Sequence, residues 1–235
     1  MNTDRFGLYY FDENSKGNEI IFPHSLTKKD KENKSQFYEL LTIKNYLIKY
    51  SQNELNYKEI YIMLKKFLES QSNITLTDLP IAYYKEDDKL KGTIIPYYQN
   101  SISLYRIINN NNLKYLQNYY HHDNDKLHNL YLLLNDILNI LEELANNNII
   151  YLDTNISNFV IKNNQIKLID FEPQYLKYET NNANIKRLLS SFDDLVYAIC
   201  SKLKLGNLAI YNSKSFKNTR NYLIKVENKI RKKTL

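Results

Sequence analysis

A carboxylate, an amide and a second carboxylate follow apolar segments within one short stretch of the chain. Asp153 comes just after the apolar pair Ile149–Ile150, Asn158 lies five residues later, and Asp170 directly follows the apolar run Ile166–Ile169. Transfer of a phosphoryl group needs a carboxylate near the acceptor hydroxyl, and it needs oxygen ligands that hold Mg²⁺ against the phosphates. The residue types and their order therefore favour a magnesium-dependent phosphoryl-transfer site.

Two short strands, expected at 159–161 and 166–169, would position these groups. The linker KNNQ contains Asn163 and Asn164, which suit a tight turn with positive φ. In such a hairpin Asn158 and Asp170 lie at the same end. The pattern therefore predicts that the amide and the second carboxylate come close together.

Helices are expected around this hairpin, because apolar residues recur with a helical period before and after it. The clearest covers 125–147, and two more are expected over 185–204 and 215–232. The apolar face of the first helix comprises Leu127, Leu130, Leu134, Ile137, Leu138, Leu141 and Leu144, with Leu133 and Ile140 on its far side.

The amino-terminal part of the chain has mainly the signals of strands. Hairpins are predicted for Gly7–Phe11 with Glu19–Phe22 and for Leu79–Tyr84 with Lys91–Tyr98, each pair separated by a polar turn. A helix is predicted over 57–68. Strands with one helix, followed by a helical half with one small hairpin, make an α+β fold.

Composition limits the classes of protein that fit. The chain has 235 residues, of which 43% are hydrophobic, and this is enough for one functional unit. A single cysteine, Cys200, excludes an internal disulfide and favours the cytoplasm. No apolar run approaches the length of a membrane helix, so no membrane partner is expected. The net charge of +6 suits an anionic partner, although solvated lysines give the same total.

The order D-x-x-x-x-N followed by apolar-apolar-Asp-Phe resembles the catalytic and metal-binding loops of the protein-kinase-like superfamily. The resemblance covers about residues 80 to 200. It implies ATP and Mg²⁺ as cofactors, with Asp153 as the catalytic base and Asn158 and Asp170 as magnesium ligands. It also implies a single two-lobed domain over 1–235, with a small β-rich N-lobe (1–97) and a reduced helical C-lobe (98–235).

The same resemblance assigns residues to adenine and to the support of the catalytic loop. Residues 91–104 look like the fifth strand and the hinge, so that Ile95 is the gatekeeper residue. The carbonyl of Pro96 and the backbone N–H of Tyr98 then bind adenine. Asp194, or alternatively Asp193, resembles the buried helix aspartate that braces the catalytic loop.

The lysine that holds the ATP phosphates has two interpretations. Lys44 in LLTIK resembles the lysine of V-A-I-K, and Glu59 would then be its partner in the following helix. Alternatively, residues 36–48 form a helix on which Lys44 is only solvated. In that case Glu39 would be the helix carboxylate, with Lys28 or Lys29 as its partner.

The chain departs from protein kinases at several motifs. Tyr151-Leu152 replaces His-Arg, and none of the four glycines forms a G-x-G-x-x-G loop. Glu172 replaces the glycine of D-F-G, which resembles choline-kinase and aminoglycoside-phosphotransferase-like enzymes. The short segment after Asp170 and the basic ending KIRKKTL resemble small atypical kinases such as the kinase of the tRNA threonylcarbamoyl-adenosine complex.

Three functions fit these features. The first is an ATP-dependent kinase of the atypical or small-molecule type that phosphorylates a hydroxyl acceptor. The second is a protein serine/threonine kinase, which has the same chemistry but is disfavoured by the short segment after Asp170. The third is a pseudokinase that serves as a binding module, prompted by the missing glycine loop. The basic tail also allows a nucleic-acid partner, which is not favoured.

Overall fold

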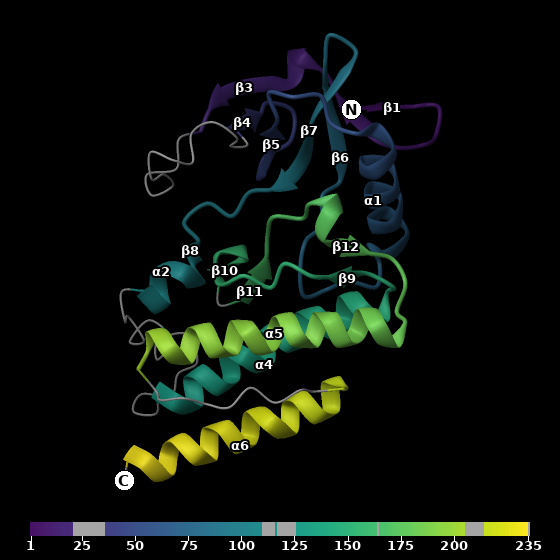
Figure 1. The fold of residues 1–235 in the computed structure, drawn as a ribbon. Helices are drawn as coiled ribbons and strands as arrows, with labels where there is room; N and C mark the ends of the chain where they lie inside the picture. The colour runs from purple at the N-terminus through teal and green to yellow at the C-terminus, as the bar shows by residue number, and fades with distance from the viewer. Residues whose placement is uncertain (21–35, 110–115, 117–125, 164, 205–213, 235) are drawn as a thin grey trace. The chain divides into compact units, whose positions relative to one another are not determined.

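The computed structural model describes residues 1–20, 36–109, 116, 126–163, 165–204 and 214–234, coloured in Figure 1. Contacts divide the chain into two compact units. Unit 1 comprises Met1–Ser72 and Asp78–Gln99, and unit 2 comprises Asn73–Thr77 and Asn100–Leu235. The main division therefore falls close to the lobe boundary expected after residue 97.

Unit 1 is built on a curled sheet whose seven described strands have the order β1-β2-β6-β7-β5-β4-β3 (Figure 1). Neighbouring strands are antiparallel, except that β2 runs parallel to β6. The strands are β1 (Asn2–Thr3), β2 (Tyr9–Phe11), β3 (Lys16–Glu19), β4 (Gln36–Leu40), β5 (Tyr46–Tyr50), β6 (Ala82–Glu86) and β7 (Lys89–Pro96).

The first predicted hairpin is wrong. The strands β2 and β3 do not pair with each other; β2 pairs with β6, and β3 pairs with β4. Between them lies a 3₁₀ turn, η1 (Glu13–Ser15), in which the N–H of Asn14 donates to the carboxylate of Asp12. This turn carries the chain from the second strand of the order to the last. Residues 21 and 22 of the predicted second strand lie outside the described residues.

The second predicted hairpin and the first predicted helix are confirmed. Strands β6 and β7 pair antiparallel, and their connection, Asp87-Asp88, has positive φ at both residues, as a tight hairpin turn requires. The helix α1 (Tyr57–Ser70) begins after Asn56, whose side chain accepts a hydrogen bond from the N–H of Lys58.

Residues 36–48 do not form the helix considered as an alternative for this segment. They form the antiparallel pair β4–β5, in which Tyr38 opposes Ile48 and Glu39 opposes Leu47. Aromatic and β-branched residues favour strands, and here pairing of β5 with both β4 and β7 outweighs an apolar spacing that also fits a helix. Lys44 lies in the connecting turn, where Asn45 has φ of 64°.

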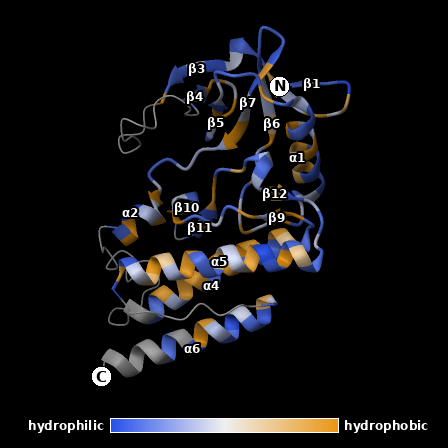
Figure 2. Cartoon of the chain, in the orientation of Figure 1, coloured by the Kyte–Doolittle hydropathy of each residue, from blue (hydrophilic) through white to orange (hydrophobic). Residues whose placement is uncertain are grey.

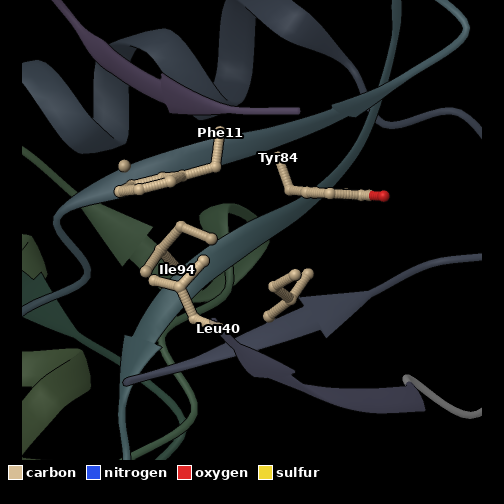
Figure 3. Close-up of a cluster of buried hydrophobic side chains, with 6 residues drawn as sticks. Phe11, Leu40, Tyr84 and Ile94 are labelled. Atoms are coloured by element: carbon tan, nitrogen blue, oxygen red, sulfur yellow. The ribbon is translucent and has the colours of Figure 1, made fainter. Parts of the chain in front are cut away.

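One face of the sheet buries an apolar cluster drawn in Figure 3. Its side chains come from five strands and have no polar group other than the hydroxyl of Tyr84. The members are Phe11, Leu40, Ile48, Ala82, Tyr84 and Ile94. Close strand packing also explains Gly92, because a Cβ there would lie 2.5 Å from the carbonyl oxygen of Lys49.

Unit 2 combines helices with two small sheets. The helices are α2 (Leu104–Asn109), α4 (Lys126–Asn146), α5 (Asn182–Lys202) and α6 (Phe216–Thr234). One sheet has the order β11-β10-β8, and the other pairs β12 with β9. These strands are β8 (Ile102–Ser103), β9 (Ile150–Tyr151), β10 (Phe159–Lys162), β11 (Gln165–Leu168) and β12 (Leu176–Lys177).

The three long helices of unit 2 confirm the sequence periodicity. The helices α5 and α6 both pack against α4, and Figure 2 shows apolar residues in orange at intervals along α5. Leu130, Leu133, Leu134, Ile137, Leu138, Ile140, Leu141 and Leu144 of α4 are buried. The side chain of Leu127, expected on the same face, lies outside the described part of the chain.

A short segment that follows α1 in sequence belongs to unit 2. Both carboxylate oxygens of Glu143 on α4 accept hydrogen bonds from it, at 3.0 Å from the N–H of Thr75 and 2.9 Å from that of Leu76. The buried hydroxyl of Thr77 donates to the carbonyl of Leu168 at 3.0 Å. These bonds attach residues 73–77 to the helix and the hairpin that support the candidate site.

The fold is α+β, as the sequence predicts, with a strand-rich unit followed by a helical unit. Within the described ranges, none of the helices combines the length and the apolar character needed to cross a membrane.

Candidate functional site

The hairpin β10–β11 brings together the ends that carry two of the predicted site residues. Asn158 closes the 3₁₀ turn η3 (Ile156–Asn158), which Asn155 caps by accepting from the N–H of Ser157. The N–H of Ile169 donates to the carbonyl of Asn158 at 2.8 Å, so Asp170 follows directly from a residue bonded to Asn158. The turn residue Asn163 has φ of 48°, as expected, and Asn164 lies outside the described residues.

The amide of Asn158 connects this hairpin to Asp153. Its Nδ2 donates to the carboxylate Oδ2 of Asp153 at 2.8 Å and to the carbonyl of the same residue at 3.1 Å. Nδ2 also donates to the hydroxyl of Tyr151 at 2.8 Å. A carboxylate oxygen only accepts, so the nitrogen must face Asp153 and the oxygen Oδ1 must face the other way. Oδ1 is the atom that a metal ion would use.

Tyr151 is a residue at this site to which the sequence assigned no role. Its side chain is fully buried, and burial raises the pKa of its hydroxyl, with further increases from the charges of Asp153 and Asp170. Both carboxylates therefore lie within electrostatic reach of one hydroxyl. The tyrosine stays neutral at physiological pH, and its hydroxyl accepts a hydrogen bond from Asn158.

The backbone at Asp170 is strained. Its φ of 68° lies in the left-handed region, which a residue with a Cβ adopts at a cost. The following side chain, Phe171, is buried and packs edge-on against the ring of Tyr151, with ring centroids 5.7 Å apart. Such strain persists only where the surroundings fix it, and the packing of Phe171 holds the chain at the residue that follows Asp170.

The predicted brace of the catalytic loop needs a correction. Asp194 is exposed; Asp193 is the buried aspartate, but its charge contributes to raising the pKa of Tyr222 on α6, after the larger effect of burial. Ser191, to which the sequence assigned no role, also contacts the loop. Its Oγ donates to the carbonyl of Leu152 at 2.8 Å and shares a second hydrogen bond with the hydroxyl of Thr154.

Helix phase explains why Ser191 takes this place. The nearby residues Ser191, Asp193 and Asp194 point in different directions, because each step along an α-helix turns the side chain by about 100°. An aspartate pair is the more visible signal in a sequence. A serine on the correct side of the helix gives no comparable signal.

In unit 1, the expected ion pair between Lys44 and Glu59 is not formed. Both side chains are exposed, Lys44 in the β4–β5 turn and Glu59 in the first turn of α1. Lys49, which sequence analysis did not single out, lies within strand β5 opposite Thr93 of β7. The buried face of α1 carries no carboxylate and consists of Ile60, Met63, Leu64, Phe67 and Ser70.

The predicted hinge residues lie at the end of β7 and just beyond it. Ile95 opposes Leu47, and Pro96 opposes Tyr46, both on β5. The hydroxyl of Tyr98 donates to the carboxylate of Asp78 at 3.0 Å. Burial, followed by the charge of Asp78, raises the pKa of Tyr98, so this side chain remains a neutral donor. The contact fixes the side chain of the residue whose backbone N–H was expected to bind adenine.

Two oxygen-bearing side chains of unit 2, Asp170 and Asn158, are of the kind that magnesium prefers. Among the described residues, no three or more His, Cys, Asp or Glu side chains group as a metal site. The loop offers instead the carboxylate of Asp170 and the oxygen Oδ1 of Asn158. Mg²⁺ prefers hard oxygen ligands and is commonly bound through one or two carboxylates together with water and phosphate oxygens, so a small set of this kind suits it.

Comparisons with known proteins give a likeness in three dimensions but none in sequence. No protein-family model and no curated protein matches the sequence. Among solved structures, the chain is similar to a divergent kinase that lacks the glycine-rich loop and regulates membrane ultrastructure of the Toxoplasma parasitophorous vacuole. The two are 11% identical with a TM-score of 0.47, and the match covers 79% of this chain and 61% of that one.

The chain thus spans less than two thirds of the length of that kinase. The likeness concerns the fold alone and carries no statement about the site. The arrangement described above, a sheet unit with one helix followed by a helical unit with a small hairpin, is consistent with a kinase-like fold.

Proposed function

We propose that the chain is an ATP-dependent phosphotransferase that moves the γ-phosphoryl group of ATP to a hydroxyl acceptor. The observation that carries this proposal is the hydrogen-bonded group formed by Asp153, Asn158 and Tyr151, with Asp170 directly after Ile169, whose N–H bonds the carbonyl of Asn158. A base and two oxygen ligands in one loop and hairpin are what phosphoryl transfer requires.

Each residue has a separate role in this proposal. The oxygen of the acceptor hydroxyl attacks the γ-phosphorus, the bond from that phosphorus to the β-phosphate oxygen breaks, and Asp153 accepts the proton of the hydroxyl. The bond from Asn158 orients the Asp153 carboxylate for this task. Asn158 Oδ1 and Asp170 would hold Mg²⁺, which neutralises phosphate charge when it is bound.

Contacts to the rest of the nucleotide are assigned to unit 1. Adenine would bind the carbonyl of Pro96 and the backbone N–H of Tyr98, beside the side chain of Ile95. For the phosphates, Lys49 is a better candidate than Lys44, because it projects from a strand paired on both sides and Lys44 projects from an exposed turn. A charge held by the sheet is positioned at a lower entropic cost.

The acceptor in this proposal is a small molecule. From Asp170 the chain reaches the start of α5 at Asn182 through only the 3₁₀ turn η4 (Pro173–Tyr175) and the two-residue strand β12. This leaves little backbone to bind an extended peptide, so a protein serine/threonine acceptor is the second choice.

A binding module without activity is the alternative that one observation favours. The buried face of α1 provides no carboxylate to pair with a phosphate-binding lysine, and this pair supports activity in protein kinases. Such a module would bind nucleotide and transfer no phosphate.

The proposal is tested by binding first and by transfer second. The unfolding midpoint of the whole chain is measured with ATP, with Mg²⁺ and with both, because a ligand that binds only the folded state raises it. Labelled phosphate transfer to sugar, choline, aminoglycoside and protein acceptors follows. We expect a Mg²⁺-dependent shift and transfer, both lost in Asp170→Asn. A shift without transfer to any acceptor would favour the binding module, and no shift would refute the proposal.

A further inference from the structure

The hydroxyl of Tyr151 is the part of the candidate site to which the proposed function assigns no task. The side chain is 0% exposed, and its hydroxyl lies 2.8 Å from Nδ2 of Asn158. The ring contacts Phe171, the residue after Asp170. One side chain therefore contacts Asn158 directly and the neighbour of Asp170.

The amide of Asn158 depends on this hydroxyl for its orientation. Nδ2 has two hydrogens and three acceptors within reach, and two of these acceptors belong to Asp153. Tyr151 supplies the third, which is the one acceptor among the described residues that does not belong to Asp153. Ser157 Oγ donates to Oδ1 of the same amide at 3.3 Å, which is a longer contact. The 2.8 Å bond to Tyr151 is therefore the shorter of the two contacts that hold the amide from outside Asp153. Asn158 is 6% exposed, so water cannot easily take the place of this hydroxyl.

We propose that Tyr151 is a positioning residue that holds the Asn158 amide with Oδ1 directed toward the metal ion. This inference rests on the proposed function, because it assigns a metal ligand its support. Partners that orient metal ligands commonly change metal affinity by about tenfold to a hundredfold when they are removed. The ring of Tyr151 has a separable task, which is to pack against Phe171.

The substitution Tyr151→Phe separates the two tasks, because it keeps the ring and removes the hydroxyl. We expect the Mg²⁺ concentration that gives half of the Mg²⁺-dependent thermal shift, at a fixed saturating concentration of ADP, to rise about tenfold or more. The unfolding midpoint without ligands provides the check on folding. The matched control is Tyr84→Phe, which removes a fully buried tyrosine hydroxyl in unit 1 and should leave the Mg²⁺ requirement unchanged.

Double substitution with Asn158→Ala tests whether Tyr151 acts through Asn158. If it does, Tyr151→Phe will raise the Mg²⁺ requirement in the wild-type background and add nothing in the Asn158→Ala background. An equal increase in both backgrounds, or none in the wild type, would overturn the positioning role while the proposed function stands. Absence of any Mg²⁺-dependent shift in the wild-type chain would instead remove the proposed function itself, so the two failures are distinguishable.

Discussion

Carboxylates in the two units have contrasting surroundings. In unit 1, the carboxylate of Asp4 accepts four hydrogen bonds, from the N–H groups of Phe6 and Leu8 and from the hydroxyls of Tyr57 and Tyr83. In unit 2, the carboxylate of Asp153 accepts one side-chain hydrogen bond within the described part of the chain, through Oδ2 from Asn158. Its other oxygen is left for a ligand.

Glu86 repeats the unit 1 pattern at another edge of the sheet. Its carboxylate pairs with Lys16 at 3.1 Å and accepts from the hydroxyls of Tyr50 and Tyr84. The ammonium group of Lys16 also lies over the rings of Tyr38 and Tyr50, 4.3 and 4.1 Å from their centroids. These contacts of one lysine and several tyrosines hold the strands of unit 1 in position. No glycine-rich loop connects these strands.

The number of protein donors to a carboxylate separates structural acids from functional acids in this chain. A carboxylate whose oxygens are occupied by protein donors stabilises the fold and has little capacity left for a substrate. A carboxylate that accepts at only one oxygen, from a residue with a fixed position, is oriented, and its second oxygen is still available to a ligand. Substitutions should therefore affect stability in unit 1 and chemistry in unit 2.

The largest effect is expected for Asp153→Asn. The rate of phosphate transfer should fall by about 10²–10⁴, because an amide cannot accept the hydroxyl proton. The unfolding midpoint should stay near that of the wild type, since the oxygen of an asparagine can still accept from Asn158. Transfer at the wild-type rate would place the base elsewhere, and a large loss of stability would break the contrast between the units.

The second-largest effect is expected for the stability of Asp4→Ala. Asp4→Ala leaves two tyrosine hydroxyls and two N–H groups without their acceptor, and it should lower the free energy of unfolding by about 2 kcal/mol. Denaturant titration followed by circular dichroism measures the change. The control is Glu54→Ala, which removes an exposed carboxylate from the same unit. Equal stability of the two variants would refute the structural role of Asp4.

The pH dependence of stability should sharpen the same comparison. The pKa of Glu86 is lowered, first by the hydrogen bond from Tyr50; that of Asp4 is lowered because its hydrogen bonds outweigh the opposing effect of burial. Stability from both is full above their ordinary values of 4.5 and 3.8 and is lost as the pH falls through the folded pKa values.

At alkaline pH stability changes with pH in the opposite direction, because the tyrosines must stay protonated to donate their hydrogen bonds. The hydrogen bond to Glu86 raises the pKa of Tyr50 to about 12, and burial raises that of Tyr57 to about 12. Their contribution is full below pH 10 and is lost as the pH rises through about 12. Unfolding midpoints measured from pH 3 to 12 should fall at both ends, and Glu86→Gln should flatten the acid end. An unchanged acid end would contradict the assignment.

The smallest effect is expected for Lys16→Met. The substitution keeps much of the apolar stem and removes a partly exposed ion pair and the contacts with tyrosine rings, for a loss of about 1 kcal/mol. Lys65→Met, which removes an ammonium group over the single ring of Tyr61, is the matched control. The difference in unfolding free energy between them reports what the ion pair with Glu86 and the second tyrosine ring add at Lys16.

Sequence periodicity predicted the elements that are long or regular. The helices α1, α4, α5 and α6 and the hairpins β6–β7 and β10–β11 all lie close to their predicted ranges. Each is specified by neighbours in sequence, through an apolar stripe, a cap or a turn with positive φ. The α+β class follows from their order.

The sequence-based predictions were wrong where the pairing partner of a strand is distant in sequence. The pattern over 36–48 fits a helix and a hairpin, and only pairing of β5 with β7 decides for the hairpin. The segment Tyr9–Phe11 is a strand, but its partner β6 lies more than sixty residues further along the chain. A local sequence pattern does not specify such a distant partner.

The sequence by itself determined which residues the candidate site contains, because Asp153, Asn158 and Asp170 stand at fixed offsets around a hairpin that local signals specify. Only the tertiary structure decided what supports them. Tyr151 contacts Asn158 across a turn, and Ser191 reaches the loop from a helix about forty residues away in sequence. Burial and helix phase bring these groups together, and both depend on the packed chain rather than on the spacing of residue types.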